Sequence, residues 1–434
     1  MSVPIPGRVA YLNARLLDPA SGLDTTGALL TEGETILDIL PGQPRPAVAP
    51  DFEVVDCQGA CLAPGLVDMR VQVREPGEEH KETLLTAGQS AVAGGVTSMV
   101  CLPNTTPVID DVATVEFMAR RARLIGLAKL YPYAAATKRL EGKELAEIGM
   151  LAEAGALGFT DGTKAIRDAR TMRRALSYAA TFGVLILQHP EEPSLATGDM
   201  HEGEMSTRLG LGGIPVAAEA IMLERDMRLV ALTGGRYHAA HVATAEGLEI
   251  IRKAKARQLP VTCDTAPPYF ALNEQAVGDY RTFAKLSPPL RSEEDRQAVV
   301  TAIEDGTIDA IASDHAPQDQ DSKRLPFAQA APGGVGLETL LPITLRLYHE
   351  KHLTLLRAIE LLSWAPSRLL SLPAGRLTKG AAADLLVFDP DRSWRIEPDK
   401  FHSKSKNSPF DGQTVQGRVL RTIVDGRLVY RADA

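Results

Sequence analysis

Residues 64–77 read PGLVDMRVQVREPG, a run of strand-forming residues with a Pro-Gly pair at each end. Arg70 and Gln72 lie two positions apart in this run, so their side chains point to the same side of the expected strand. Two histidines at that spacing could bind one metal ion, but an arginine stays protonated and a glutamine amide oxygen is a poor ligand for zinc. The stretch therefore predicts a strand with polar side chains at metal-ligand spacing that are not metal ligands.

The chain that follows alternates strand-like runs with amphipathic helical stretches about eight times, which is typical of a (β/α)₈ barrel of the TIM type, an α/β fold. Helical stretches such as 217–232 and 245–257 separate the strands. The expected strands are residues 66–73, 97–102, 130–135, 157–161, 184–189, 237–242, 260–265 and 308–314.

Both ends of the chain differ from the middle. Short strand-like runs near the start (9–12 and 28–30) and near the end (383–388 and 419–424) are separated by turn residues. We expect the two ends to form one small β-sandwich around the barrel termini. Its parts are residues 1–62 and 373–434, with the barrel at 63–372.

Composition excludes several classes of function. The chain has 434 residues and a formal net charge of -8, with no basic run, which argues against a nucleic-acid or anionic-membrane partner. No long apolar segment and no signal-peptide pattern are found, so we expect a cytoplasmic protein. Cys57, Cys61, Cys101 and Cys263 are irregularly spaced, which indicates reduced thiols. Cys57 and Cys61 lack the second pair that a zinc site needs.

Polar residues lie where the expected barrel strands end, and the active sites of such barrels are found at these C-terminal strand ends. They are Arg70, Gln72, Asn104, Asp161, His189, His241 and Asp314. His238, inside an expected strand, is interpreted as a core histidine bonded to its neighbours.

The motifs resemble the dihydroorotases, cyclic amidohydrolases of pyrimidine synthesis, over nearly the whole chain. The first-strand signature of that family reads PGLVDxHxHxREPG, with histidines where this chain has Arg70 and Gln72. The other matching motifs are LPNTTP (102–107), HEG (201–203), HAAHV (238–242), SPPLR (287–291), DAIASDHAP (309–317), PGGVGLET (332–339) and SKSKNSPF (403–410).

The resemblance implies roles for the polar residues at the strand ends. In active members two zinc ions share a bridging carboxylate and make a hydroxide, while an aspartate moves the proton. His189 and His241 match the histidines of the second metal, and Asp314 matches the catalytic aspartate that also touches the first. Asp161 stands where the family commonly has two adjacent aspartates, and it matches either the bridging ligand or its neighbour. Arg74 and Asn104 match groups that hold the substrate carboxylate.

Other departures lie near the same centre. Gln318 stands where the family's DHAPH motif ends in a substrate-binding histidine, and Ser287 replaces the usual asparagine before PPLR. Residues 266–269, APPY, lack the histidine pair of the family's TPHH, with Tyr269 at the last position. Because a buried carboxylate needs a partner, Asp314 could pair with Arg70, which would then supply the metal's positive charge without its Lewis acidity. Pro332-Gly333-Gly334 could help to close the site.

These residues lead to a prediction of a dihydroorotase-like protein that is non-catalytic, with no zinc or one zinc ion and no binuclear site. By resemblance to inactive members of the family, it is expected to be a structural partner of aspartate transcarbamoylase and a homo-oligomer. The rival hypothesis is an active amidohydrolase that interconverts N-carbamoyl-L-aspartate and dihydroorotate with a single zinc held by His189, His241 and an aspartate. A third hypothesis is a sensor of a small carboxylate that uses Arg74 and Asn104.

Overall fold

Eight parallel strands form the centre of the barrel in a computed structural model that describes residues 7–433. Each lies within one of the eight ranges expected from the sequence or begins one residue before it. They are β6 (Leu66–Val71), β7 (Val96–Cys101), β8 (Lys129–Pro132), β9 (Gly158–Phe159), β10 (Leu185–Gln188), β13 (Arg236–Ala239), β14 (Val261–Thr265) and β15 (Ala310–Ile311). Single bridges, Ala134 with Phe159 and Val71 with His315, join the three-stranded and five-stranded sheets into a closed ring.

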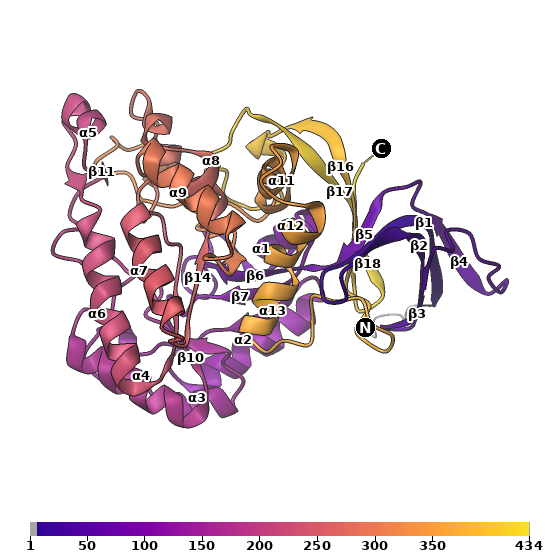
Figure 1. Ribbon diagram of the computed structural model, residues 1–434, viewed down its shortest axis with the longest axis horizontal. Helices are drawn as coiled ribbons and strands as arrows, with labels where there is room; N and C mark the ends of the chain where they lie inside the picture. The colour runs from indigo at the N-terminus through magenta and orange to yellow at the C-terminus, as the bar shows by residue number, and fades with distance from the viewer. Residues whose placement is uncertain (1–6, 434) are drawn as a thin grey trace.

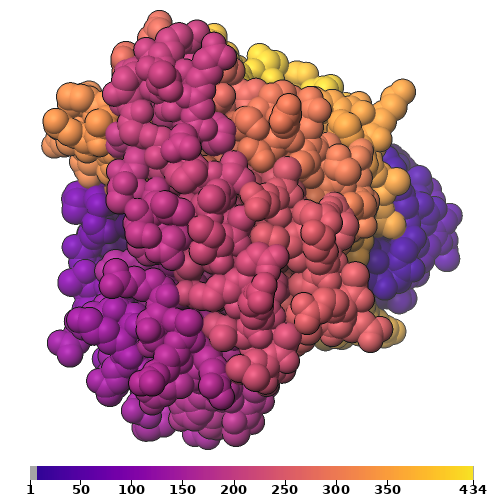
Figure 2. All heavy atoms as spheres, turned by 60° about the vertical axis from the view of Figure 1, so that its left-hand side comes forward, coloured from indigo at the N-terminus to yellow at the C-terminus, as the bar shows by residue number. Residues whose placement is uncertain are grey.

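Helices cover the outside of the ring, which confirms the expected TIM-type architecture (Figure 1). The stretches expected to be helical at 217–232 and 245–257 are α6 and α7. In Figure 2 these helices make a continuous outer wall, with the indigo N-terminal strands projecting at its right edge. The principal helices are α1 (Leu84–Ala93), α2 (Val112–Ile125), α3 (Ile148–Glu153), α4 (Ala169–Phe182), α6 (Ala217–Thr233), α7 (Ala245–Ala256), α9 (Glu293–Glu304), α11 (Leu340–His349), α12 (Leu355–Leu362) and α13 (Trp364–Leu369).

Local sequence signals set the helix ends. The side chain of Asp111 accepts a hydrogen bond from the backbone N–H of Thr114 at the start of α2, and Gly126 ends the helix in the left-handed conformation, with φ of 69°. Ser292 caps α9 in the same way, and acidic residues occupy its first turn, where they favour the positive end of the helix dipole.

The two chain ends come together, as expected from their short strand-like runs, and their strands form one eight-stranded sheet. The strand order is β18-β17-β16-β5-β1-β2-β3, with β4 paired to β1. Leu16, Leu29 and Leu62 are among the buried residues of its own apolar core. The strands are β1 (Arg8–Asp18), β2 (Leu23–Glu32), β3 (Thr35–Pro41), β4 (Phe52–Asp56), β5 (Cys61–Pro64), β16 (Leu385–Arg395), β17 (Thr414–Val424) and β18 (Arg427–Arg431).

The end sheet passes directly into the barrel at Gly65. This glycine lies between β5 and β6, and a Cβ on it would come within 2.2 Å of the Thr97 side chain. Only glycine therefore fits the junction without a shift of its neighbour. The junction fixes where β6, and with it Arg70 and Gln72, enters the barrel.

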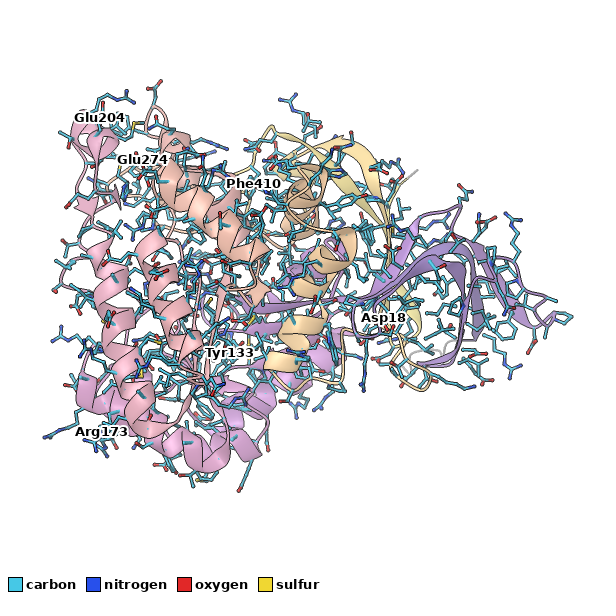
Figure 3. All side chains as sticks on the ribbon, in the orientation of Figure 1. Asp18, Tyr133, Arg173, Glu204, Glu274 and Phe410 are labelled. Carbon is cyan, nitrogen blue, oxygen red and sulfur yellow. The ribbon has the colours of Figure 1, made fainter. Side chains whose placement is uncertain are left out.

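A small lobe extends from the barrel between β10 and β13. It contains β11 (Met200–His201), α5 (Glu204–Leu209) and β12 (Gly213–Ile214), and β11 pairs with β12 in parallel. Glu204 of this lobe and Glu274 of a later loop lie at the same end of the molecule in Figure 3. None of the helices in residues 7–433 is long and apolar enough to span a bilayer.

Candidate functional site

A cavity of about 240 Å³ opens at the barrel mouth, at the ends of β6, β7 and β15. It is also bounded by the loops at 267–269, 286–287, 332–336 and 409–410. Figure 3 places Phe410, one of the lining residues, near the end of the barrel that carries α8 (Pro267–Ala271). Among the residues expected at the site, the structure brings Arg70, Gln72, Arg74, Asn104, Asp314, Tyr269, Ser287 and Gln318 to the cavity wall.

Arg70 and Asp314 form an ion pair inside the mouth, as expected from the need to neutralise a buried carboxylate. The distance from Nε of Arg70 to Oδ1 of Asp314 is 2.9 Å, and the side chains are 2% and 15% exposed. Nη2 of Arg70 also donates to the carbonyl oxygen of Gly162 at 3.4 Å. Burial alone would raise the pKa of Asp314, but neighbouring His241 and Arg70 outweigh it and hold this pKa well below its usual range.

The two retained histidines lie behind Asp314 and bond to each other. Nδ1 of His241 is 2.9 Å from Oδ2 of Asp314, and its Nε2 is 2.7 Å from Nδ1 of His189. Burial, followed by the nearby Arg70 guanidinium, lowers the pKa of His241 to about 4, so its ring is neutral at pH 7. Because Nδ1 of His241 donates to the carboxylate, its Nε2 is the acceptor, and His189 donates from Nδ1. The second ring nitrogen of His189 lies 3.4 Å from Glu191.

These side chains do not fit the binuclear zinc site that the resemblance implies. At the first position the guanidinium of Arg70 takes the place of a ligand and occupies Asp314. At the second, Nδ1 of His189 and Nε2 of His241 point at each other at 2.7 Å, so a metal ion there would have to replace the proton that they share. Asp161 is turned to Thr137, accepting from its backbone N–H at 2.9 Å and its hydroxyl at 2.6 Å. Within residues 7–433 no group of three His, Cys, Asp or Glu side chains is arranged to hold a metal ion.

The two residues matched to substrate recognition have partners within the chain. Nη1 of Arg74 lies 2.8 Å from Glu78, and its Nε donates to the carbonyl oxygen of Pro317 at 3.1 Å. Asn104 donates from Nδ2 to Oε1 of Gln72 at 3.1 Å. A ligand carboxylate would therefore have to share Arg74 with Glu78.

Gln318 leaves one polar atom without a partner at the cavity wall. Its Nε2 donates to the carbonyl oxygen of Pro332 at 2.8 Å, while its Oε1 is buried without a hydrogen-bond partner among the described residues. Gly333, from the loop expected to help close the site, lies beside it. A buried carbonyl oxygen without a donor is unfavourable, and the Gln318 residue lines the cavity wall.

The backbone is strained at three of the site residues. Arg74, His241 and Asp314 have φ values of 61°, 40° and 50°, in the left-handed region that side chains other than glycine seldom adopt. Such conformations persist where surrounding contacts hold them, and they gather at functional sites. The ion pair and the histidine pair supply those contacts here.

The sequence reasoning missed the groups behind the histidines. Burial alone would raise the pKa of Glu191, but His189 and Arg291 lower it below its ordinary value. Arg291 lies 3.7 Å from Glu191 and ends the matched motif SPPLR. The sequence held a signal for these contacts, because Glu191 follows the candidate ligand His189 by two positions. A buried acid at that position needs a cation as its partner. His238 is a core residue, as interpreted, and bonds Thr262 at 2.8 Å.

Sequence comparisons find similar proteins over nearly the whole chain. A family profile described as "Dihydro-orotase-like" matches residues 59–247. The dihydroorotase of Anaplasma phagocytophilum (strain HZ) is 47% identical over 429 residues, which are 98% of this chain and 96% of that protein. The dihydroorotase of Pelobacter propionicus is 45% identical over 420 residues, covering 96% and 98%.

Solved structures show the same fold. The L-hydantoinase (dihydropyrimidinase) of Arthrobacter aurescens superposes with a TM-score of 0.87 at 25% identity, covering 98% of this chain and 96% of that one. The dihydropyrimidinase of Brevibacillus agri gives a TM-score of 0.81 at 20% identity, with 98% and 95% covered. At that level of identity the second match supports the fold alone.

Proposed function

Since this chain belongs to the dihydroorotase family, we propose that it is a dihydroorotase-like protein of pyrimidine biosynthesis that does not carry out the family's two-zinc reaction. The observation that carries this proposal is the ion pair between Nε of Arg70 and Oδ1 of Asp314 at 2.9 Å. The names of the relatives describe dihydroorotases, so activity is the property to be tested first.

The chemistry of the ion pair argues against hydrolysis. Opening a cyclic amide needs a polarised carbonyl and a nucleophilic water. Arg70 could hold an oxygen anion, but it cannot take a proton from water because it is already fully protonated. Asp314, the remaining base, is a weak one, since Arg70 and His241 favour its ionised form and depress its pKa.

Metal content tests the proposal directly. After expression with added zinc, the purified protein should contain less than about one equivalent of tightly bound zinc per chain, because a closed set of ligands is missing. Elemental analysis of the full chain measures this. Two zinc ions per chain would overturn the non-catalytic proposal and restore the family reaction.

We further propose that the chain serves as a structural partner of aspartate transcarbamoylase. The support is the resemblance to inactive family members, together with a barrel and end sheet that are complete while the ligand positions have changed. A stable complex should bury more than about 1,000 Å² and should not depend on the side chains of Asp314 or His241. Co-expression followed by size-exclusion chromatography tests this, with Asp314→Asn as a matched variant. Separate elution at micromolar concentration would contradict it.

A second candidate function is favoured by the cationic Arg70 and the amide side chain of Gln318, which line the same cavity. A small carboxylate that also carries an N–H group would satisfy both, which agrees with a role as a sensor. Calorimetric titration with N-carbamoyl-L-aspartate in the presence of a chelator should detect binding, and Gln318→Leu should weaken it. Equal binding by the variant, or no heat of binding, would remove this candidate.

A further inference from the structure

A second cavity, of about 510 Å³, lies between the C-terminal strands and the barrel. Strands β16 and β17 run beside α11 in Figure 1, and the cavity opens where they meet this helix and the end of α1. The lining includes no residue of the barrel-mouth cavity. The two cavities are therefore separate, although Glu338 of the second adjoins Thr339 of the first.

Three arginines at this cavity have no acidic partner. Among residues 7–433, no carboxylate oxygen lies within 4.0 Å of the guanidinium groups of Arg392, Arg395 and Arg418, the distance within which ion pairs such as Arg252 with Asp305 occur. Arg395 donates only to the carbonyl oxygen of Gly412, at 3.2 Å.

Three acids line this cavity, and two of them, Glu397 and Glu338, are already engaged, while Asp433 is the third. Oε2 of Glu397 lies 2.6 Å from Nζ of Lys400. Oε1 of Glu338 accepts from the Ser90 hydroxyl at 2.9 Å and from the backbone N–H of His402 at 2.7 Å. The lining carries four cationic side chains, Arg392, Arg395, Lys400 and Arg418, against these three acids, on a chain with a formal net charge of -8.

Aromatic rings form another part of the wall. The guanidinium of Arg418 lies 4.9 Å from the ring centre of Trp394, whose Nε1 is fixed by a hydrogen bond to the carbonyl oxygen of Gly417. The rings of His402 and Tyr430 meet edge to face at 5.8 Å. Fixed rings beside unpaired guanidinium groups offer a stacking surface next to an anion site.

We propose that this cavity binds a nucleoside phosphate, with its phosphates at Arg392, Arg395 and Arg418 and its base against Trp394. Guanidinium groups bind phosphate oxygens through two parallel N–H···O hydrogen bonds. A planar base stacks on an indole or phenol ring regardless of its exact identity. Neither part of the ligand alone uses both features of the cavity.

Calorimetric titration of the full chain with ATP tests the proposal. We expect binding that weakens with added salt, and Arg392→Ala and Arg418→Ala should each reduce the affinity roughly tenfold or more. Arg139→Ala is the matched control, because this arginine is 78% exposed on another face and should leave affinity unchanged. Circular dichroism verifies that each variant is folded.

The two tryptophans of the chain provide a second readout. ATP should change the fluorescence of a Trp364→Phe variant, which retains Trp394, but not that of a Trp394→Phe variant. Tripolyphosphate, which lacks a base, should bind several-fold more weakly than ATP. No binding at millimolar ATP, equal binding by tripolyphosphate, unchanged affinity in both arginine variants, or binding of polyglutamate in place of ATP would each overturn the proposal.

Discussion

The two sides of the barrel mouth differ in whether they retain the histidines of the family's metal site. At the end of β6, Arg70 and Gln72 occupy the positions of the family's first two histidines, whereas at the ends of β10 and β13 both histidines remain. Asp314 joins the two sides, with Oδ1 bound to Arg70 and Oδ2 to His241. The retained histidines bond to Asp314 and to each other. The change at β6 thus places an arginine against a carboxylate that also contacts the retained histidines.

Removing the arginine should have the largest effect. Arg70→Met leaves Asp314 buried beside a neutral histidine, and loss of one partner of a buried pair costs roughly 3–5 kcal/mol of the free energy of unfolding. Urea unfolding at pH 7 measures it. Arg252→Ala is the control, since its pair with Asp305 is about 40% exposed and should cost at most about 1 kcal/mol. An Arg70→Met loss no larger than that of the control would show that the β6 side is not held by this pair.

Glu219 gives the β13 side a pH dependence of its own. Burial raises the pKa of this carboxyl from 4.5 to about 7, and it accepts hydrogen bonds from the backbone N–H groups of Ala243 and Thr244. Between those pH values the folded state binds more protons than the unfolded chain, so the free energy of unfolding should fall by up to about 3 kcal/mol as pH rises. Glu219→Gln should flatten this slope.

Urea titrations at a series of pH values measure the slope of the Glu219 prediction. Glu246→Gln, an exposed change on α7, serves as the control and should leave the slope as in the parent protein. A slope that persists unchanged in Glu219→Gln would show that other groups produce it.

Restoring the β6 side should have the smallest effect on activity. The Arg70→His/Gln72→His double variant should bind more zinc than the parent or Arg70→Met, since it regains two ligands. Hydrolysis of dihydroorotate should stay low, because Gln318 and Tyr269 are unchanged and Asp161 remains bound to Thr137. Elemental analysis and a turnover assay measure both properties. Full activity in this variant would mean that the residues at positions 70 and 72 alone account for the lack of activity in the parent protein.

Much of the fold could be predicted from the sequence. The strands that end at His189 and His241, and the helices α6 and α7, follow directly from runs of buried residues and amphipathic periodicity. The pairing of Arg70 with Asp314 was also predictable, because a buried carboxylate near a barrel mouth needs a cation and Arg70 lies in the same mouth.

Other features of the site could not be predicted, because they depend on contacts that no local pattern encodes. Thr137 donates a hydrogen bond to Asp161, which lies 24 positions further along the chain. Arg74 donates to Glu78 across a turn in which the backbone of Arg74 is left-handed. The hydrogen bond between His189 and His241 spans 52 positions. Residue identity gives the chemistry that is available, whereas the choice of partner comes from the tertiary structure.

Turnover of dihydroorotate by the purified full chain tests the central claim most directly. The assay is run with added zinc for the natural sequence and for Asp314→Asn, after both are shown to be folded. If Arg70 has replaced the first metal, neither protein will convert substrate above the buffer rate. Turnover by the natural sequence that Asp314→Asn abolishes would contradict the account.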